Sequence, residues 1–361
     1  MSVLSRFQTF RLPVFPSSGL SDYYCTMKFL VIRFSSIGDI VLTTPVVRCL
    51  KKQVATAEVH YVTKKAYAGI LSANPYVDKI HVLDDNLEAV IEILKQEDFD
   101  YVIDLHHNLR TLKVKRALGK PSFSFNKLNI EKWKLTVLKI NKLPGIHIVD
   151  RYMQTLSSFG VKNDGAGLDY FIDKQDVVSE SDIPTAHQAG YIGLVIGAAH
   201  NTKQYPLHHL EAFCKTMDHP IIVLGGKEDA VNGEKLAAID PFKIYNACGK
   251  FNLQESADLV RRAKLVISND TGLMHIAAAF KRPVISLWGN TVPEFGMYPY
   301  YGNNFISHQQ QLPYDIMETK GLRCRPCSKI GYDKCPKGHF KCMELIAPAA
   351  VIEQATARLR R

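Results

Sequence analysis

Short apolar runs alternate along the chain with segments in which apolar residues recur every three or four positions. Runs such as KFLVIRF at 28–34 are typical of buried strands, whereas LEAVIEILKQ at 87–96 has the period of an amphipathic helix. Strands that alternate with helices predict βαβ units, which build a parallel sheet with helices on both faces. Because the alternation occurs twice, the sequence predicts two Rossmann-like, doubly wound α/β domains.

The predicted domain limits follow from the place where the alternation stops. It runs through an N-terminal domain, 27–178, and gives way to DKQDVVSESDIPTAHQAG at 173–190, which is polar and has no period. Such a stretch is typical of a linker. The alternation restarts at YIGLVIG and predicts a C-terminal domain over 188–345.

The two ends of the chain are predicted to lie outside these sheets. Residues 1–26 hold no continuous apolar segment of the signal-peptide kind, and we expect a disordered tail or an upstream mis-start there. Residues 346–361 predict an amphipathic helix that returns to pack against the N-terminal domain. Its apolar face would consist of Val351, Ile352, Ala355 and Leu359.

The composition is that of a globular protein with an anionic partner. Of 361 residues, 46% are hydrophobic and 22% are charged, and the formal net charge is +10. A basic chain suits nucleic acid, an anionic membrane surface or a sugar phosphate. No RNP, zinc-finger or helix-turn-helix signature accompanies the charge, which disfavours nucleic acid. No run reaches the ~18 apolar residues that a membrane-spanning helix needs.

The eight cysteines fall into two groups. Four are scattered singly along a chain without a secretory signal, which is typical of a reducing cytoplasm. The other four lie within 324–342 with the spacing C-x2-C-x7-C-x6-C, and His339 lies among them. A tetrahedral zinc site is one interpretation, and free or disulfide-paired cysteines are the other. The scattered residues are Cys25, Cys49, Cys214 and Cys248, and the clustered ones are Cys324, Cys327, Cys335 and Cys342.

The first candidate site residues follow the first predicted strand. Two open α/β sheets that face each other bind ligands in the cleft beyond the carboxyl ends of their strands. The stretch SSIGD brings Ser36, Gly38 and Asp39 to that edge, with Gly38 allowing a tight turn. Asp39 could be the N-cap of the next helix, or its carboxylate could accept a proton from a bound hydroxyl.

The second domain has candidate residues after its own strands. In SNDTG, Asp270, Thr271 and Gly272 join a strand to a helix, whose free N–H groups could bind phosphate. A simple helix cap is the alternative, with His275 as the first polar residue of the helix face. In GAAHNTKQYP, Lys203 could neutralise a diphosphate or could be a solvated surface lysine.

Other motifs are weaker or missing. Glu228 in VLGGKED, after the next strand, could hold ribose hydroxyls. No GxGxxG fingerprint follows the first strand, and neither GxxxxGK[ST] nor GxSxG occurs. These absences argue against a dinucleotide-dependent dehydrogenase, a P-loop NTPase and a hydrolase with a nucleophile elbow.

Three stretches together resemble glycosyltransferase family 9, the ADP-heptose:lipopolysaccharide heptosyltransferases. They are VIRFSSIGDIVLTTPVV, GAAHNTKQYP and SNDTGLMHIAAAFKRPVISLWG, and they occur in the family's order between Lys28 and the C-terminus. The resemblance implies a GT-B fold with a central cleft, the acceptor on the N-terminal domain and ADP-heptose on the C-terminal one. It further implies inverting transfer to the lipid A/inner-core acceptor at the inner face of the cytoplasmic membrane, without a metal or a cofactor.

The resemblance also assigns roles to individual positions. Asp39 matches the family's general base and Lys203 its diphosphate-contacting lysine, while Glu228 matches the nucleotide-side carboxylate only loosely. Asp270, Thr271, Gly272 and His275 match the donor motif. On the acceptor side we expect Ser36, Gly38 and, in DLHHNLRT, Arg110, for which a surface ion pair is the alternative.

One loop departs from the family's pattern. Threonines that often precede the family's lysine are Ala198 and Ala199 here, so Asn201 or Thr202 would have to supply their hydrogen bonds to phosphate. Two other functions therefore stay open at this point. One is a GT-B transferase that uses another nucleotide sugar, and the other is a catalytically silent protein that binds an anionic glycolipid.

Overall fold

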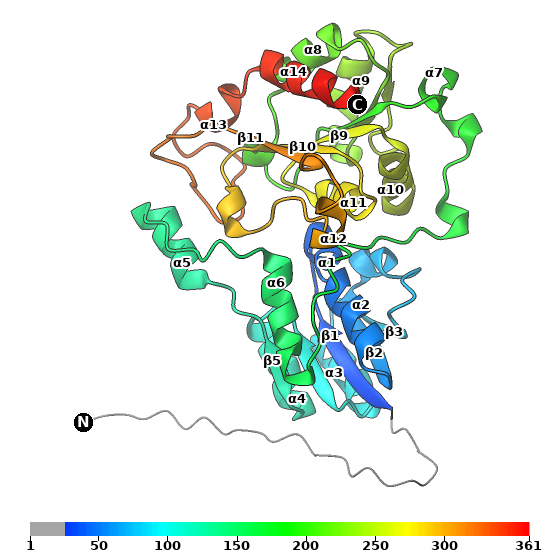
Figure 1. The fold of residues 1–361 in the computed structure, drawn as a ribbon, viewed down its shortest axis with the longest axis vertical. Coiled ribbons are helices and arrows are strands. Elements are labelled where there is room, and N and C mark those ends of the chain that lie inside the picture. Colours follow the sequence, from blue (N-terminus) through cyan, green and yellow to red (C-terminus); the bar gives the residue numbers. More distant parts are fainter. Residues whose placement is uncertain (1–25, 361) are drawn as a thin grey trace.

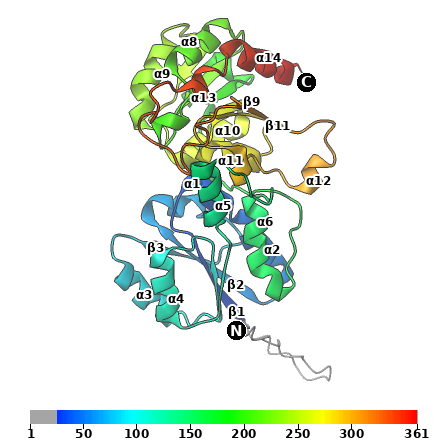
Figure 2. The same ribbon diagram turned by 90° about the vertical axis from the view of Figure 1, so that its left-hand side faces the viewer.

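The structure, a computed structural model, describes residues 26–360 and contains two parallel sheets, one in each half of the chain (Figure 1). The expectation for the N-terminal tail falls outside the described residues, apart from Thr26. The first sheet has the strand order β3-β2-β1-β4-β5, and the second has the order β11-β10-β9-β6-β7-β8. Separate apolar clusters cover the two faces of the first sheet, with α3 and α4 on one side and α2 and α6 on the other (Figure 2). The prediction of two doubly wound domains is confirmed.

The N-terminal half contains the elements of the first sheet and its helices. The strands are β1 (Met27–Ile32), β2 (Ala57–Lys64), β3 (Lys79–Leu83), β4 (Tyr101–Asp104) and β5 (Ser122–Ser124). The helices are α1 (Ile37–Val41), α2 (Thr44–Gln53), α3 (Leu87–Gln96), α4 (Leu109–Leu118), α5 (Asn129–Trp133) and α6 (Ile148–Met153), with a π-helical turn at Lys134–Leu138 and 3-10 turns at Lys65–Ile70 and Gln154–Phe159.

The C-terminal half follows a connection that contains 3-10 turns at Lys174–Asp176 and Glu180–Asp182. Its strands are β6 (Ile192–Val195), β7 (Ile221–Leu224), β8 (Ile244–Asn246), β9 (Leu265–Asn269), β10 (Val284–Trp288) and β11 (Tyr314–Glu318). Its helices are α7 (Thr185–Gln188), α8 (Leu207–Thr216), α9 (Ala230–Ala237), α10 (Leu253–Arg262), α11 (Gly272–Ala279), α12 (Asn303–Ile306), α13 (Lys341–Glu344) and α14 (Pro348–Leu359), and further 3-10 turns lie at Asn201–Lys203, Lys227–Asp229 and Pro293–Phe295. Between residues 26 and 360, no helix has the length and apolar character to cross a membrane.

Each sheet has one switch point, where the strand order reverses direction. In the first sheet this point lies between β1 and β4, and in the second it lies between β6 and β9. Helices on either side of a switch point cover opposite faces, which opens a crevice at the carboxyl ends of the two central strands. The loops that follow β1, β4, β6 and β9 are therefore positioned to bind ligands.

The C-terminal helix α14 packs against the second domain and not, as the sequence suggested, against the first. Val351 and Ala355 are buried in the apolar cluster of the second sheet. Arg358 forms an ion pair with Asp315 of β11 at 2.7 Å. Figure 1 shows α14 beside α8, at the far end from the N-terminal domain. The amphipathic pattern correctly predicted which face of the helix is buried. It does not determine the partner, because such a face can pack against any uncovered apolar surface.

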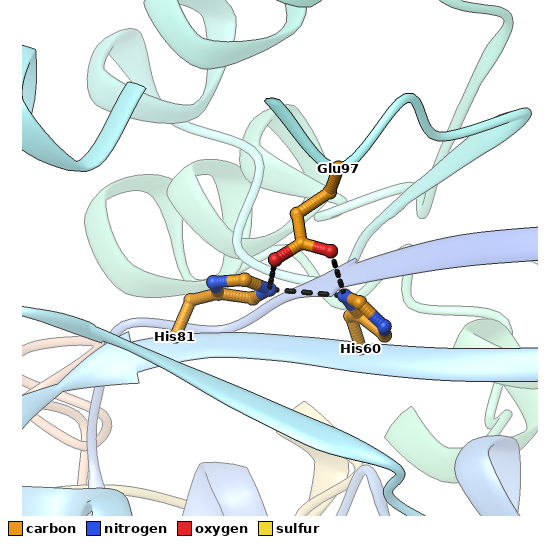
Figure 3. Close-up of side chains that lie close together, drawn as sticks. All are labelled: His60, His81 and Glu97. Atoms are coloured by element: carbon orange, nitrogen blue, oxygen red, sulfur yellow. Dashed lines mark hydrogen bonds and ion pairs between the residues drawn. The ribbon is translucent and has the colours of Figure 1, made fainter. Parts of the chain in front are cut away.

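A polar cluster is buried between β2, β3 and the end of α3 (Figure 3). His60 Nδ1 and His81 Nε2 are 3.0 Å apart, and Glu97 lies within 3.9 Å of both rings. These three residues have the spacing of metal ligands, but the carboxylates around them are already paired. Lys79 binds Glu97, and Lys28 lies 3.8 Å from Glu58, which accepts a hydrogen bond from His60. Two lysines thus neutralise two carboxylates, and the residues of the cluster have hydrogen-bond and ion-pair partners within the protein.

Candidate active site

A cleft of about 680 Å³ lies between the two domains, at the switch points of both sheets. The loop after β1 supplies one wall, and the loops after β6 and β9 supply the wall opposite. From the first domain the cleft is lined by Arg33, Ser35, Ser36, Ile37, Gly38, Asp39, Tyr67, His106, Phe125, Lys127, Asn129, Lys132 and Ile148, and from the second by Ala199, His200, Lys203, Asp270, Thr271, Gly272, His275, Met297, Lys329 and Ile330.

The N-termini of α1 and α11 meet where the two domains join (Figure 1). A Cβ on Gly38 would lie 2.5 Å from Cδ2 of His275, and one on Gly272 would lie 2.7 Å from Cγ2 of Ile37. Real Cβ atoms essentially never make contacts that short, because van der Waals repulsion rises steeply. The two glycines therefore let the helix starts approach each other and bring both sets of candidate residues into one cleft.

Asp39 is held by a buried arginine at the end of β1. Nη2 of Arg33 lies 2.7 Å from Oδ1 of Asp39. The same guanidinium donates hydrogen bonds to the carbonyl oxygens of Ser35 and Leu105 at 2.6 and 2.7 Å, and to the hydroxyl of Tyr152 at 3.1 Å. Arg33 thus contacts the loop after β1, the loop after β4 and helix α6 while it binds the carboxylate of Asp39. Its fixed fork geometry leaves Asp39 little freedom to turn.

Asp39 is the third residue of its helix and not the N-cap that the sequence suggested. Helix α1 begins at Ile37 with Ser36 as N-cap. Oδ2 of Asp39 accepts hydrogen bonds from the hydroxyl of Ser36 at 2.9 Å and from its backbone N–H at 3.3 Å. Burial disfavours the ionised carboxylate, but the Arg33 charge and the Ser36 hydrogen bonds outweigh burial and lower the pKa of Asp39 from its usual value. Asp39 is therefore ionised at neutral pH.

On the opposite wall, Lys203 is paired with Asp270. Nζ of Lys203 lies 2.6 Å from Oδ2 of Asp270, and the hydroxyl of Thr291 donates to the same oxygen at 2.9 Å. The side chain of Lys203 is 17% exposed, so it is not the solvated surface lysine of the alternative interpretation. Asp270 holds the ammonium group at the mouth of the second domain's crevice.

The start of helix α11 completes this wall. The N-cap Thr271 makes no side-chain capping bond, so the first N–H groups of α11 are not capped by that hydroxyl and can meet an anion. His275 is 2% exposed, and its Nδ1 is buried without a hydrogen-bond partner among residues 26–360. Burial, with a contribution from Lys203, lowers the pKa of His275 to about 4, so the ring is neutral at pH 7.

Comparison with known proteins distinguishes a transferase from a protein that only binds a glycolipid. The family model described as glycosyltransferase family 9 (heptosyltransferase) matches residues 87–318. The chain belongs to glycosyltransferase family 9. It is therefore a glycosyltransferase, and the catalytically silent alternative is set aside.

Relatives of known sequence are similar along most of their length. Lipopolysaccharide heptosyltransferase 1 of Campylobacter coli is 26% identical over 312 residues, which cover 77% of this chain and 86% of the relative. Lipopolysaccharide heptosyltransferase 2 of Escherichia coli is 23% identical over 359 residues, which cover 92% of this chain and 99% of the relative.

Solved structures share the fold. A family 9 glycosyltransferase from Veillonella parvula superposes with a TM-score of 0.73 at 23% identity, covering 92% of this chain and 97% of that one. The E. coli heptosyltransferase WaaC with ADP superposes with a TM-score of 0.65 at 20% identity, covering 92% of this chain and 100% of that one. The expected GT-B fold, with two Rossmann-like domains around a central cleft, is confirmed.

Within this family 9 chain, the structure brings most of the sequence-predicted residues into the cleft. Two lie outside its lining. Arg110 is exposed at the start of α4 and stacks over the ring of Phe34 at 5.6 Å, and Glu228 is exposed on the 3-10 turn after β7. Their substrate contacts stay predictions. Ala199 lines the cleft. The hydroxyl of Thr202 is already hydrogen-bonded to the backbone of Tyr332, so Thr202 does not replace the missing family threonines.

Sequence reasoning missed several basic residues that line the cleft. Lys127 and Lys132 come from the chain around α5, and Lys329 comes from the cysteine-rich segment. Burial lowers the pKa of Lys132 to about 8, with Arg151 as the next cause. The sequence signal that could have found these lysines is the high density of lysines in the segment after β5. That segment does not follow the alternation of strands and helices.

The cysteine-rich segment 324–342 is attached to the second domain beside the cleft. Arg325 forms an ion pair with Glu318 at 2.6 Å and donates to the carbonyl oxygen of Gly289 at 2.6 Å. Sγ of Cys324 lies 3.7 Å from Nε2 of His339, and all four cysteines are free thiols. The segment thus holds the loop after β10 and carries Lys329 to the cleft.

We predict that Gly38→Ala impairs transfer and stability together. The added methyl group would meet the buried ring of His275, and such overpacking typically costs about 1–3 kcal/mol. Thermal unfolding should show the loss, and the transfer rate should fall because α1 and α11 separate. Gly69→Ala is the control, since a Cβ there meets nothing within 4 Å. Equal stability and rates in both variants would contradict a tight contact between the helices.

Proposed function

We propose that this chain transfers a heptose from ADP-heptose to the lipid A/inner-core acceptor of lipopolysaccharide, with inversion and without a divalent metal. The family and the names of the relatives support the sugar and the pathway. Solved neighbours include WaaC with ADP-2-deoxy-2-fluoro heptose, which supports the donor class. The observation that carries the proposal is the pairing of an ionised carboxylate, Asp39, on one wall with a cation and a helix N-terminus on the wall opposite.

The proposed reaction is a single displacement. The acceptor hydroxyl attacks the anomeric carbon of the heptose, the bond from that carbon to the diphosphate breaks, and ADP leaves with the electron pair. Asp39 takes the proton of the hydroxyl as the new C–O bond forms. Its low pKa keeps it ionised and makes it a modest base, so proton transfer follows bond formation, when the attacking oxygen has become acidic.

The leaving diphosphate is stabilised by the second domain. Lys203 supplies a point charge, and the N–H groups and dipole of α11 supply further donors. Positive charge is therefore already in place where the diphosphate develops negative charge, the position at which a metal ion would act. We propose that Asp270 positions Lys203 through their 2.6 Å ion pair.

The role of Asp39 is tested by a double-mutant cycle with Arg33. Asp39→Asn alone should lower the transfer rate by about 10²–10⁴-fold. It should also destabilise the fold by about 3–5 kcal/mol, because it leaves the buried Arg33 charge unpaired. Replacing Arg33 by Gln as well should restore stability without restoring transfer. The rate is measured with ADP-heptose and a delipidated inner-core acceptor, and stability by thermal unfolding.

The cycle separates chemistry from structure. Recovery of transfer in the double variant would show that Asp39 serves only to neutralise Arg33. Retention of wild-type turnover in Asp39→Asn would leave the mechanism without its base.

Donor binding is tested with Lys203→Ala. Loss of a charge-assisted hydrogen bond to phosphate should weaken ADP-heptose binding by about 1.5–3 kcal/mol, or roughly 10- to 150-fold. Titration calorimetry measures the change, with Lys227→Ala, an exposed lysine in the next loop, as the control. UDP- and GDP-sugars are titrated in parallel. Tighter binding of either would identify another donor, and unaltered ADP-heptose affinity in Lys203→Ala would remove the lysine from the donor site.

The acceptor side should depend on pH through Lys132. Its pKa of about 8 means that the ammonium form holds below pH 8 and is lost as the pH rises through that value. An acceptor that carries phosphates or carboxylates should then bind less well, so its KM should rise several-fold between pH 7 and 9 while kcat changes less. Lys132→Arg should keep the low KM at pH 9, because arginine stays charged. A profile that is identical in the variant would contradict this role.

The proposed site of action is the inner face of the cytoplasmic membrane, where the enzyme would associate peripherally with an anionic surface. The acceptor is lipid-linked, and the formal net charge of +10 favours encounter with anionic headgroups. We propose a nucleotide sugar, a lipid-linked saccharide and this surface as the partners, and no nucleic acid.

A further inference from the structure

An arm formed by residues 129–146 projects from the first domain beside the cleft. It consists of α5, the π-helical turn and the chain that leads to α6 (Figure 1). In Figure 2 the same helix faces the viewer and lies at the level of the junction between the domains. Asn129 and Lys132, at the base of the arm, line the cleft.

The inner side of the arm is fastened to the second domain. Leu135 is 8% exposed and packs with Val292 and Phe295. Nζ of Lys139 donates to the carbonyl oxygens of Cys324 and Pro326 at 3.1 and 2.6 Å. These contacts fix which side of the arm faces outward.

The outer side is apolar and exposed, which is unusual for a soluble surface. The exposed fraction is 65% for Ile130, 50% for Trp133 and 57% for Val137. Leu138 and Ile140 continue the patch with exposed fractions of 49% and 47%. Five large apolar side chains exposed within eleven residues of one segment are typical of an interaction site.

The charge of the arm identifies its partner. Residues 129–146 contain four lysines and one glutamate. Lys132 and Lys139 face inward as described, while Lys142 is exposed and Lys134 is half-buried. Tryptophan, aliphatic side chains and lysines on one short helical segment are the composition of elements that lie in the headgroup layer of a bilayer.

We propose that the outer face of this arm, formed by Ile130, Trp133, Val137, Leu138 and Ile140, inserts into the surface of an anionic lipid bilayer. This inference rests on the proposed function, in which the acceptor is anchored in the membrane. Insertion of the arm would orient the mouth of the cleft toward the headgroups. The acceptor saccharide would then reach Lys132 and Asp39 without leaving the bilayer.

Tryptophan fluorescence of the full chain tests the insertion directly. The chain has two tryptophans, and Trp288 is 1% exposed in the core, so a change on adding vesicles reports on Trp133. Vesicles that contain phosphatidylglycerol should shift the emission to the blue, and the shift should weaken with added salt. Phosphatidylcholine vesicles should give a smaller shift. An emission spectrum unchanged by anionic vesicles would overturn the proposal.

Variants assign the binding to the arm. The double substitution Val137→Gln and Leu138→Gln should lower partitioning onto anionic vesicles at least tenfold, with the fold intact because both side chains are exposed. Phe242→Gln is the matched control, since Phe242 is 88% exposed on the second domain. Equal partitioning of the wild type and the arm variant would overturn the proposal, as would an equal loss in the control.

Activity distinguishes this inference from the proposed function. The arm variant should transfer heptose to a delipidated acceptor at the wild-type rate, and its KM for a vesicle-embedded acceptor should rise at least tenfold. Equal KM values on vesicles would refute the role of the arm while leaving the transferase function intact. Absence of transfer to either acceptor by the wild type would refute the proposed function, whereas the fluorescence result would stand by itself.

Discussion

The close contact between the starts of α1 and α11 is the constraint on which the candidate site depends. Two separately wound sheets can face each other at many distances, and an ordinary side chain at this point would hold them apart. Gly38 and Gly272 remove that obstacle from both sides, against the ring of His275 and the side chain of Ile37. Gly38 directly precedes Asp39, and Gly272 lies two residues after Asp270. The contact that joins the domains therefore also sets the distance between the carboxylate and the wall proposed to bind the diphosphate.

The ion pair between Arg33 and Asp39 shows why the proposed base needs support from the fold. Burying a lone carboxylate would favour its neutral form, which cannot accept a proton. Arg33 keeps it ionised, and three further acceptors bind the same guanidinium. The same pairing lowers the basicity of Asp39. Such a carboxylate suits a displacement in which the leaving group is good and the attacking hydroxyl loses its proton late, and would serve poorly where a proton must be removed first.

The sequence predicted those parts of the molecule that depend on local order along the chain. Asp39, Lys203 and Asp270 lie in the cleft because each follows a buried strand, and strand ends of parallel sheets meet at one edge. The edge strands β5, β8 and β11 were not predicted, because their sequences, SFS, IYN and YDIME, lack a clear apolar run. Arg33 was read as part of a strand, although an arginine at the end of an apolar run requires a buried partner. The partner of α14 could not be predicted, because amphipathicity fixes a buried face but not the surface that covers it.

In the proposed mechanism, the charged residues of the cleft fall into two groups, one for catalysis and one for recognition of the acceptor. Arg33 with Asp39, and Lys203 with Asp270, form two pairs that each close within one domain. Both pairs form when the domains fold, so their side chains are already oriented before a substrate binds. Substrate binding therefore loses little free energy to ordering these side chains. Lys127 contacts a backbone carbonyl and Lys132 lies over an aromatic ring, so neither is neutralised by these contacts. These lysines come from the arm and its approach, outside the two sheets. Changes in that segment could therefore alter which anionic acceptor binds while the groups that carry out the transfer stay in place.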